Sequence, residues 1–126
     1  AVRLHPVFVE ILEEVFAEAA AMGITLKITS GFRSVGEQRR LFRRLGPGQA
    51  ARPGESFHNF GLAVDLRASP PDALDEVGVI AEEHGLRWGG RFTGGLREPW
   101  HIDMGSVISI QEARQAVTPD QLVEVV

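Results

Sequence analysis

Two histidines and two carboxylates of this sequence stand in patterns that suit metal chemistry. His58 precedes Asp65 by seven residues, and Asp65 ends an otherwise apolar run. A lone carboxylate among apolar neighbours is costly to bury unless it is paired or binds a metal. Glu98 and His101 are three residues apart, and the proline between them prevents a regular central strand. In a turn, the second pair can face the same cavity as the first.

Two imidazoles and one carboxylate, with a fourth position left for water, form the ligand set of one large class of catalytic zinc sites. His58, Asp65 and His101 can supply that set, and Glu98 is placed to act as general base and acid. Seven residues in an extended strand would separate His58 from Asp65 by roughly 23 Å, too far for one ion. We therefore expect the chain to turn between His58 and Gly61.

The same residues also allow simpler interpretations. His58 and Asp65 can serve as helix caps or as an ion pair, and Arg33 can form a surface ion pair as readily as it binds a substrate. The remaining histidines, His5 and His84, stand at the expected start and end of helices. A cationic side chain near a helix C-terminus meets the negative end of the helix dipole, so a structural role is expected for His84.

Composition limits the function classes that remain. The chain has 126 residues, of which 44% are hydrophobic and 24% charged, which predicts one compact domain over residues 1–126. The net charge of −4 argues against nucleic acid or an anionic membrane surface as a partner. No apolar run approaches the roughly 20 residues of a membrane helix. With no cysteine, there is no thiolate nucleophile or ligand.

Hydrophobic periodicity, caps and breakers predict the elements that must position these residues. The predicted helices cover 5–22, 34–45, 69–85 and about 112–116, with a further short helix after residues 118–119. The predicted strands cover 25–30, 60–66 and about 101–104, and the stretches 46–57 and 88–97 are loops rich in glycine. This order predicts an α+β fold in which a small antiparallel sheet is flanked by helices.

Three motifs resemble those of the zinc-dependent peptidoglycan peptidases. These include D-alanyl-D-alanine carboxypeptidases, D-alanyl-D-alanine dipeptidases and L-alanyl-D-glutamate endopeptidases. The motifs are SGFRSVGEQRRLF at 30–42, SFHNFGLAVDL at 56–66, and WGGRF with EPWHIDM across 88–104. The middle motif, Ser-x-His-x-x-Gly-x-Ala-x-Asp, is highly specific, and the three together span about 75 residues.

The resemblance implies a role for each motif residue and a small Hedgehog-like α+β fold. It implies that His58, Asp65 and His101 bind Zn²⁺. It further implies that Glu98 is the catalytic base and that Arg33 holds a substrate or transition-state oxygen. The remaining pair, Gln38 and Ser56, is expected to line the substrate pocket.

The motifs are most similar to those of the compact L-alanyl-D-glutamate endopeptidases, which cut within the peptidoglycan stem peptide. A D-alanyl-D-alanine carboxypeptidase or dipeptidase is the alternative, because those endopeptidases often carry Asp where this chain has Glu98. Glu98 followed by Trp100 resembles the dipeptidase branch. Two further alternatives are a non-catalytic Hedgehog-like zinc-binding module and an interaction domain with incidental histidines. Glu98 argues against the first, because a structural zinc site needs no base.

The resemblance also implies a partner and a place of action. The expected partner is the peptidoglycan stem peptide, and the protein is expected to be a monomer. It should act at the cell wall, as a secreted or periplasmic enzyme or as a phage-encoded lysin. The opening residues AVRLHPVF lack the charged start and cleavage site of a signal peptide.

Overall fold

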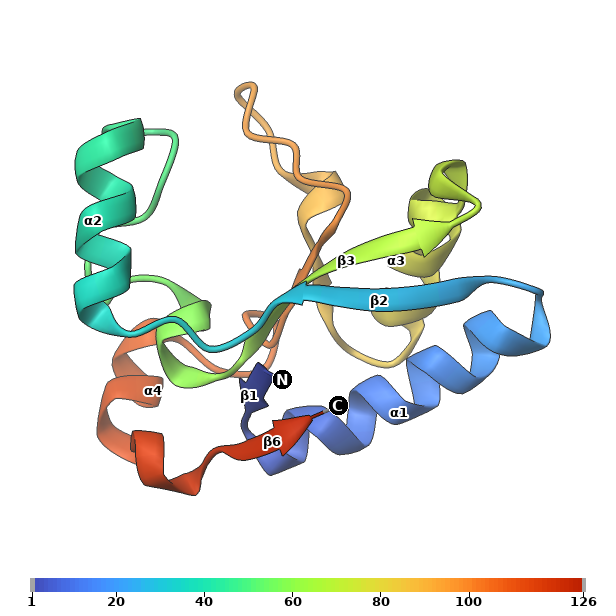
Figure 1. Cartoon of the computed structure of the whole chain (residues 1–126), viewed down its shortest axis with the longest axis horizontal. Helices are drawn as coiled ribbons and strands as arrows, with labels where there is room; N and C mark the ends of the chain where they lie inside the picture. Colours follow the sequence, from blue (N-terminus) through green and yellow to red (C-terminus); the bar gives the residue numbers. More distant parts are fainter. Residues whose placement is uncertain (1, 126) are drawn as a thin grey trace.

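The computed structural model describes residues 2–125 and shows the expected mixture of helices and antiparallel strands (Figure 1). The helices are α1 (Pro6–Ala21), α2 (Val35–Leu45), α3 (Leu74–Glu83) and α4 (Ile110–Ala116). The strands are β1 (Val2–Leu4), β2 (Thr25–Ser30), β3 (Ala63–Ser69), β4 (Arg87–Trp88), β5 (His101–Asp103) and β6 (Val123–Val125). Short 3-10 helices are η1 (Phe57–Phe60), η2 (Pro71–Ala73), η3 (Gly89–Arg91) and η4 (Pro119–Gln121).

The central sheet is antiparallel, with the strand order β2-β3-β5-β4. Its register places Asp65 of β3 directly opposite His101 of β5 on one side and Ser30 of β2 on the other. Directly opposed residues of an antiparallel pair project to the same face of the sheet. The pairing therefore brings two distant parts of the sequence, residues 65 and 101, onto one face.

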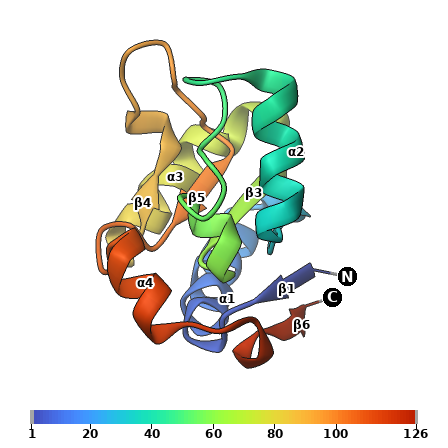
Figure 2. The ribbon, with the colours of Figure 1, turned by 90° about the vertical axis from the view of Figure 1, so that its left-hand side faces the viewer.

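Strand β3 separates the hydrophobic core from the polar site by simple alternation. Val64, Leu66 and Ala68 are buried with the apolar faces of α1 and α3 in one cluster. Asp65, between two of them, projects to the opposite face because successive side chains alternate along a strand. Figure 2 shows α2 and α1 on different sides of β3. The cleft that Asp65 lines is also lined by residues of α2 and of the segment that leads into β5.

The two longest helices begin as their sequences predict. His5 caps α1, its Nδ1 accepting the Val7 N–H at 3.2 Å, and Pro6 occupies the first turn. Ser34 and Glu37 form a reciprocal capping box at the start of α2, with bonds of 3.0 and 2.9 Å. The caps fix where α2 starts, directly after the segment that carries Arg33.

Several predicted elements needed correction. The short helix predicted after residues 118–119 is present as the single 3-10 turn η4, with Thr118 as its N-cap and Pro119 in its first turn, and the chain then enters β6. Strand β6 pairs with β1 from the opposite end of the chain, so residues 123–125 are extended instead of continuing the helical turn. Strands β1, β4 and β6 were not predicted at all. The strand predicted at 60–66 begins later, at Ala63, because η1 occupies residues 57–60.

Within residues 2–125, no helix combines the length and the apolar character needed to cross a membrane.

Candidate active site

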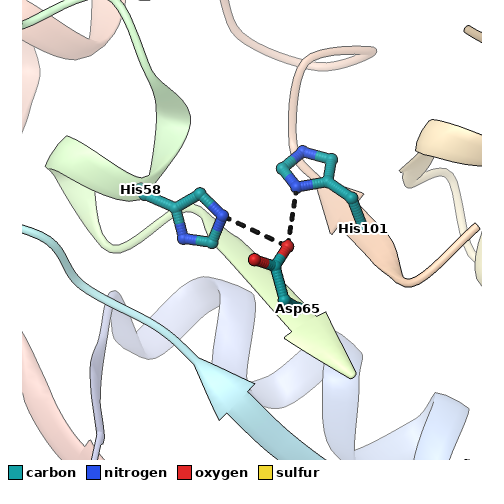
Figure 3. Close-up of side chains that lie close together, drawn as sticks. All are labelled: His58, Asp65 and His101. Atoms are coloured by element: carbon teal, nitrogen blue, oxygen red, sulfur yellow. Dashed lines mark hydrogen bonds and ion pairs between the residues drawn. The ribbon is translucent and has the colours of Figure 1, made fainter. Parts of the chain in front are cut away.

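His58, Asp65 and His101 form a compact triangle in which two imidazoles face one carboxylate (Figure 3). The Asp65 Oδ1 atom lies 3.3 Å from Nε2 of His58 and 3.1 Å from Nδ1 of His101. Ligand atoms of the three residues all lie within 4.8 Å of one another. The structure thus brings together the three residues that the sequence analysis selected as metal ligands.

Each member of the triangle comes from a different element. His58 lies on η1, whose first residues are capped by Ser56: its Oγ accepts the His58 N–H at 3.2 Å. Gly61 ends η1 in the left-handed conformation, with φ at 66°, and the chain then enters β3. The expected turn between His58 and Gly61 is therefore confirmed. The β3–β5 register adds His101 opposite Asp65.

The second nitrogen of each imidazole ring is already engaged. Nδ1 of His58 lies 2.8 Å from the Gly31 carbonyl oxygen, and Nε2 of His101 lies 2.7 Å from Oδ2 of Asp103. Because both partners are acceptors, both nitrogens donate. Nε2 of His58 and Nδ1 of His101 are left to face Asp65, which is the arrangement that a metal needs.

Charges in the triangle stabilise one another against the cost of burial. Burial raises the pKa of Asp65, but hydrogen bonds and charge from His101 and His58 hold it well below its usual range. Burial lowers the pKa of His101, yet Asp103 and Asp65 together raise it to about 9. The negative charge of Asp65 therefore favours a cation beside the two imidazoles, which is the electrostatic condition that a metal ion also needs.

Glu98 lies at the edge of the triangle. Its Oε1 is 3.8 Å from Nδ1 of His101, and 37% of its side chain is exposed. Two backbone hydrogen bonds fix the turn that carries Glu98. Glu98 N–H donates to Gly89 O at 2.9 Å, and His101 N–H donates to Glu98 O at 3.0 Å. A carboxylate in this position has access to both solvent and the triangle, as a general base requires.

The other predicted site residues border the same cleft. Arg33 donates to Oε1 of Gln38 at 2.9 Å and to Oγ of Ser30 at 3.2 Å. Gln38 is almost completely buried, and its amide also donates to Ala51 O at 2.7 Å. Gln38 therefore holds Arg33 and the loop after α2 in place, whereas Ser56 caps η1.

Three polar residues around the site were missed by sequence reasoning. The buried side chain of Asn59 accepts the backbone N–H groups of Gly54 and Ser56 and donates to Arg33 O. Asp103 and Arg87 form a two-bond ion pair behind His101. Asp103 carried one usable signal: it stands two residues after His101 in a strand, so both side chains share a face. Arg87 carried none.

The triangle opens into a cleft of about 660 Å³ that Arg33, Ser56, Glu98 and Trp100 help to line. A larger hollow of about 1020 Å³ lies between α1 and β2, but it is lined mainly by apolar side chains and contains none of the residues of the triangle. The chemistry of the side chains, and not the size of the hollow, identifies the cleft as the candidate site.

Sequence comparisons connect the chain to peptidoglycan peptidases. The family model VanY, D-alanyl-D-alanine carboxypeptidase, matches residues 1–88. The peptidoglycan L-alanyl-D-glutamate endopeptidase CwlK of Bacillus subtilis (strain 168) is 36% identical over 109 residues. That match covers 69% of this chain and 65% of the Bacillus protein, so the chain spans a little less than two thirds of this relative.

Solved structures share the fold. A zinc complex of a mutant of the vancomycin-resistance D,D-pentapeptidase VanY has a TM-score of 0.66 at 21% identity, covering 95% of this chain and 83% of that one. The L-Ala D-Glu endopeptidase ChiX of Serratia marcescens has a TM-score of 0.62 at 26% identity, covering 79% of each chain. These likenesses confirm the α+β peptidase fold. Since the family model matches well over half of the sequence, the chain belongs to the VanY D-alanyl-D-alanine carboxypeptidase family.

Proposed function

We propose that the chain is a zinc-dependent peptidase that cuts the peptidoglycan stem peptide between L-alanine and D-glutamate. The observation that carries the proposal is the triangle of His58, Asp65 and His101 beside an open cleft, with Glu98 at its edge. The choice of bond is supported by CwlK and ChiX, both named as endopeptidases for this bond, at 36% and 26% identity.

The donor set fits zinc. Two imidazole nitrogens and one carboxylate oxygen lie within 4.8 Å of one another, and each imidazole has its other nitrogen held by an acceptor. Zinc held by His58, Asp65 and His101 would supply Lewis acidity, polarising a water molecule and the peptide carbonyl. The VanY structure of the same fold is described as a complex with Zn(II), which agrees with this assignment.

The protein's own groups would handle the proton and the developing charge. Glu98 accepts a proton from the attacking water and passes it to the amine nitrogen that leaves. Arg33, held by Gln38 and Ser30, presents its cationic guanidinium to the cleft, where it can stabilise negative charge on the carbonyl oxygen. Ser56 supports the reaction indirectly, because it caps the 3-10 helix that positions His58.

A D-alanyl-D-alanine carboxypeptidase is the second candidate function. The family model that matches residues 1–88 carries this description, and the VanY structure shares the fold. The triangle and the general base serve either reaction, since both hydrolyse a peptide bond. In either case the proposed place of action is the cell wall, reached by secretion, by export to the periplasm or by release as a phage lysin.

Product analysis separates the two candidates. Purified cell walls, a stem pentapeptide and free D-alanyl-D-alanine are each digested, and the products are identified by mass spectrometry. We expect cleavage between L-alanine and D-glutamate, loss of the reaction on treatment with a chelator, and recovery on addition of zinc. Release of terminal D-alanine alone supports the carboxypeptidase, and hydrolysis that survives complete removal of metal contradicts the zinc mechanism.

A further inference from the structure

We propose that Asp103, fixed by Arg87, positions His101 so that the nitrogen presented to the metal is Nδ1. The inference rests on the proposed function, because it concerns the ligand triangle. Neither residue belongs to that triangle: both lie on the far side of the His101 ring. They are therefore positioning residues, which act on the metal only through His101.

Asp103 is fully buried, and each of its oxygens accepts two hydrogen bonds. Oδ2 accepts from Nε2 of His101 at 2.7 Å and from Nη2 of Arg87 at 2.6 Å. Oδ1 accepts from Nε of Arg87 at 2.8 Å and from the Gly105 backbone N–H at 2.7 Å. All four partners are donors, so the site is built for a carboxylate that only accepts.

This arrangement decides which ring nitrogen is available. Because Asp103 accepts, Nε2 of His101 must carry a hydrogen, and Nδ1 is the nitrogen that can offer a lone pair to a cation. Nδ1 is also the atom that faces Asp65, at 3.1 Å. The carboxylate behind the ring makes the imidazole a stronger electron donor than a neutral acceptor would. His58 has such a neutral acceptor, the Gly31 carbonyl, and presents Nε2 instead.

Arg87 keeps Asp103 in this position. It approaches from β4, the neighbour of β5, and its two-bond fork fixes the plane of the carboxylate. The guanidinium lies 5.3 Å from the ring centre of Phe57 and 4.9 Å from that of Phe92. These contacts restrict the long side chain, so that the Asp103 carboxylate has little freedom to turn away from His101.

The test exchanges Asp103 for asparagine, which is nearly the same size. If the amide oxygen replaces Oδ1, the amide NH₂ takes the place of Oδ2, where it meets the Nη2 donor of Arg87 and can donate to Nε2 of His101. That bond moves the ring hydrogen to Nδ1. If the oxygen replaces Oδ2, the NH₂ meets the N–H groups of Arg87 and Gly105. The first arrangement leaves a hydrogen on Nδ1 of His101, where the metal would bind. The second weakens the contact between residue 103 and Arg87. We expect Asp103→Asn to bind zinc about 10–100-fold more weakly than the parent, measured by competition with a chromogenic chelator.

Two further variants accompany it. Arg87→Lys keeps the charge but cannot donate two parallel hydrogen bonds to Asp103, and we expect zinc affinity to fall measurably, by up to about tenfold. Glu82→Gln is the matched control, because Glu82 of α3 accepts the same pair of bonds from Arg91, at 3.0 and 2.8 Å, and neither residue lines the cleft. Zinc affinity should be unchanged there. Long-range ¹H–¹⁵N spectra of the zinc-loaded parent should show His101 bound through Nδ1 and His58 through Nε2.

The outcomes separate this inference from the proposed function. A parent protein that binds no zinc contradicts the proposed function itself. A parent that binds zinc, with Asp103→Asn of equal affinity and unchanged ring-nitrogen spectrum, overturns only the positioning role. Coordination of His101 through Nε2 in the parent overturns it as well. If Asp103→Asn does not fold, Arg87→Lys decides, because parent affinity in that variant contradicts the role assigned to the pair.

Discussion

Glu98 is the residue whose position best separates a peptidase from a site that only binds metal. Its carboxylate lies 3.8 Å from Nδ1 of His101 without belonging to the ligand triangle. A purely structural zinc site is closed by a fourth protein ligand, whereas a catalytic site leaves a position for water. The partial exposure of Glu98 leaves room for that water and for exchange of protons with solvent.

The first prediction concerns Glu98→Gln. The amide has nearly the size of the carboxylate but cannot accept a proton, so we expect retained zinc and a loss of hydrolysis of about 100- to 10,000-fold. Stem-peptide cleavage is followed by mass spectrometry, and metal content by atomic emission. Glu55→Gln is the matched control, because Glu55 lines the same cleft outside the triangle. Parent-like rates in Glu98→Gln would show that Glu98 is not the base.

At the scale of one element, the site depends on the turn that η1 makes between His58 and β3. Gly61 ends this turn with φ at 66° and packs closely: a Cβ there would lie 2.6 Å from Cδ2 of Leu122 and 3.0 Å from the His5 backbone nitrogen. Leu122 precedes β6, and His5 precedes α1. The turn is therefore wedged between segments from both ends of the chain.

The second prediction compares two glycines. Gly61→Ala and Gly23→Ala both place a side chain at positive φ, which costs about 1–2 kcal/mol of the free energy of unfolding. Only Gly61 also has close neighbours, so its variant should lose a further 1–3 kcal/mol or so. Zinc affinity should fall only in Gly61→Ala, because His58 lies on the same turn. Urea unfolding measures stability, and chelator competition measures zinc affinity. Equal losses of stability in the two variants would show that the close packing of Gly61 adds nothing.

In the molecule as a whole, α1 and α3 pack against each other (Figure 1), and His84 connects the two helices. His84 follows α3, and its two ring nitrogens lie 3.0 and 2.8 Å from carboxylates of Glu14 and Glu18 on α1. The hydrogen bond to Glu18, with the charges of both glutamates, raises the pKa of His84. The expected structural role thus takes the form of an ion-pair bridge between helices.

The third prediction is a pH dependence of stability. The folded pKa of His84 is raised, so the bridge contributes fully below the unfolded pKa of about 6.5 and is lost as the pH rises through the folded value. We expect His84→Gln to lower the free energy of unfolding at about pH 5.5 and to have little effect at about pH 9. Glu10→Gln, an exposed change elsewhere on α1, should not show this difference. A deficit that is equal at both pH values would contradict the ion-pair role.

Local sequence determined much of this protein. Caps and helical periodicity placed α1 and α2, because those signals act within a few residues. The motif around His58 and Asp65 named two candidate ligands and predicted the turn between them, which the structure confirms. The turn could be predicted because His58 and Asp65 can reach one ion only if the chain reverses between them, and Gly61 permits that reversal.

Tertiary structure decided the parts that depend on distant pairing. The register of β3 and β5 sets Asp65 opposite His101, and the pairing of β1 with β6 joins the two ends of the chain. The role of Asp103 becomes visible only in the structure, where β4 brings Arg87 beside it. Backbone hydrogen bonds between strands and the desolvation of a buried carboxylate depend on which segments meet in space. A local pattern can identify the residues whose chemistry suits a site. The fold decides which other residues hold those side chains in position.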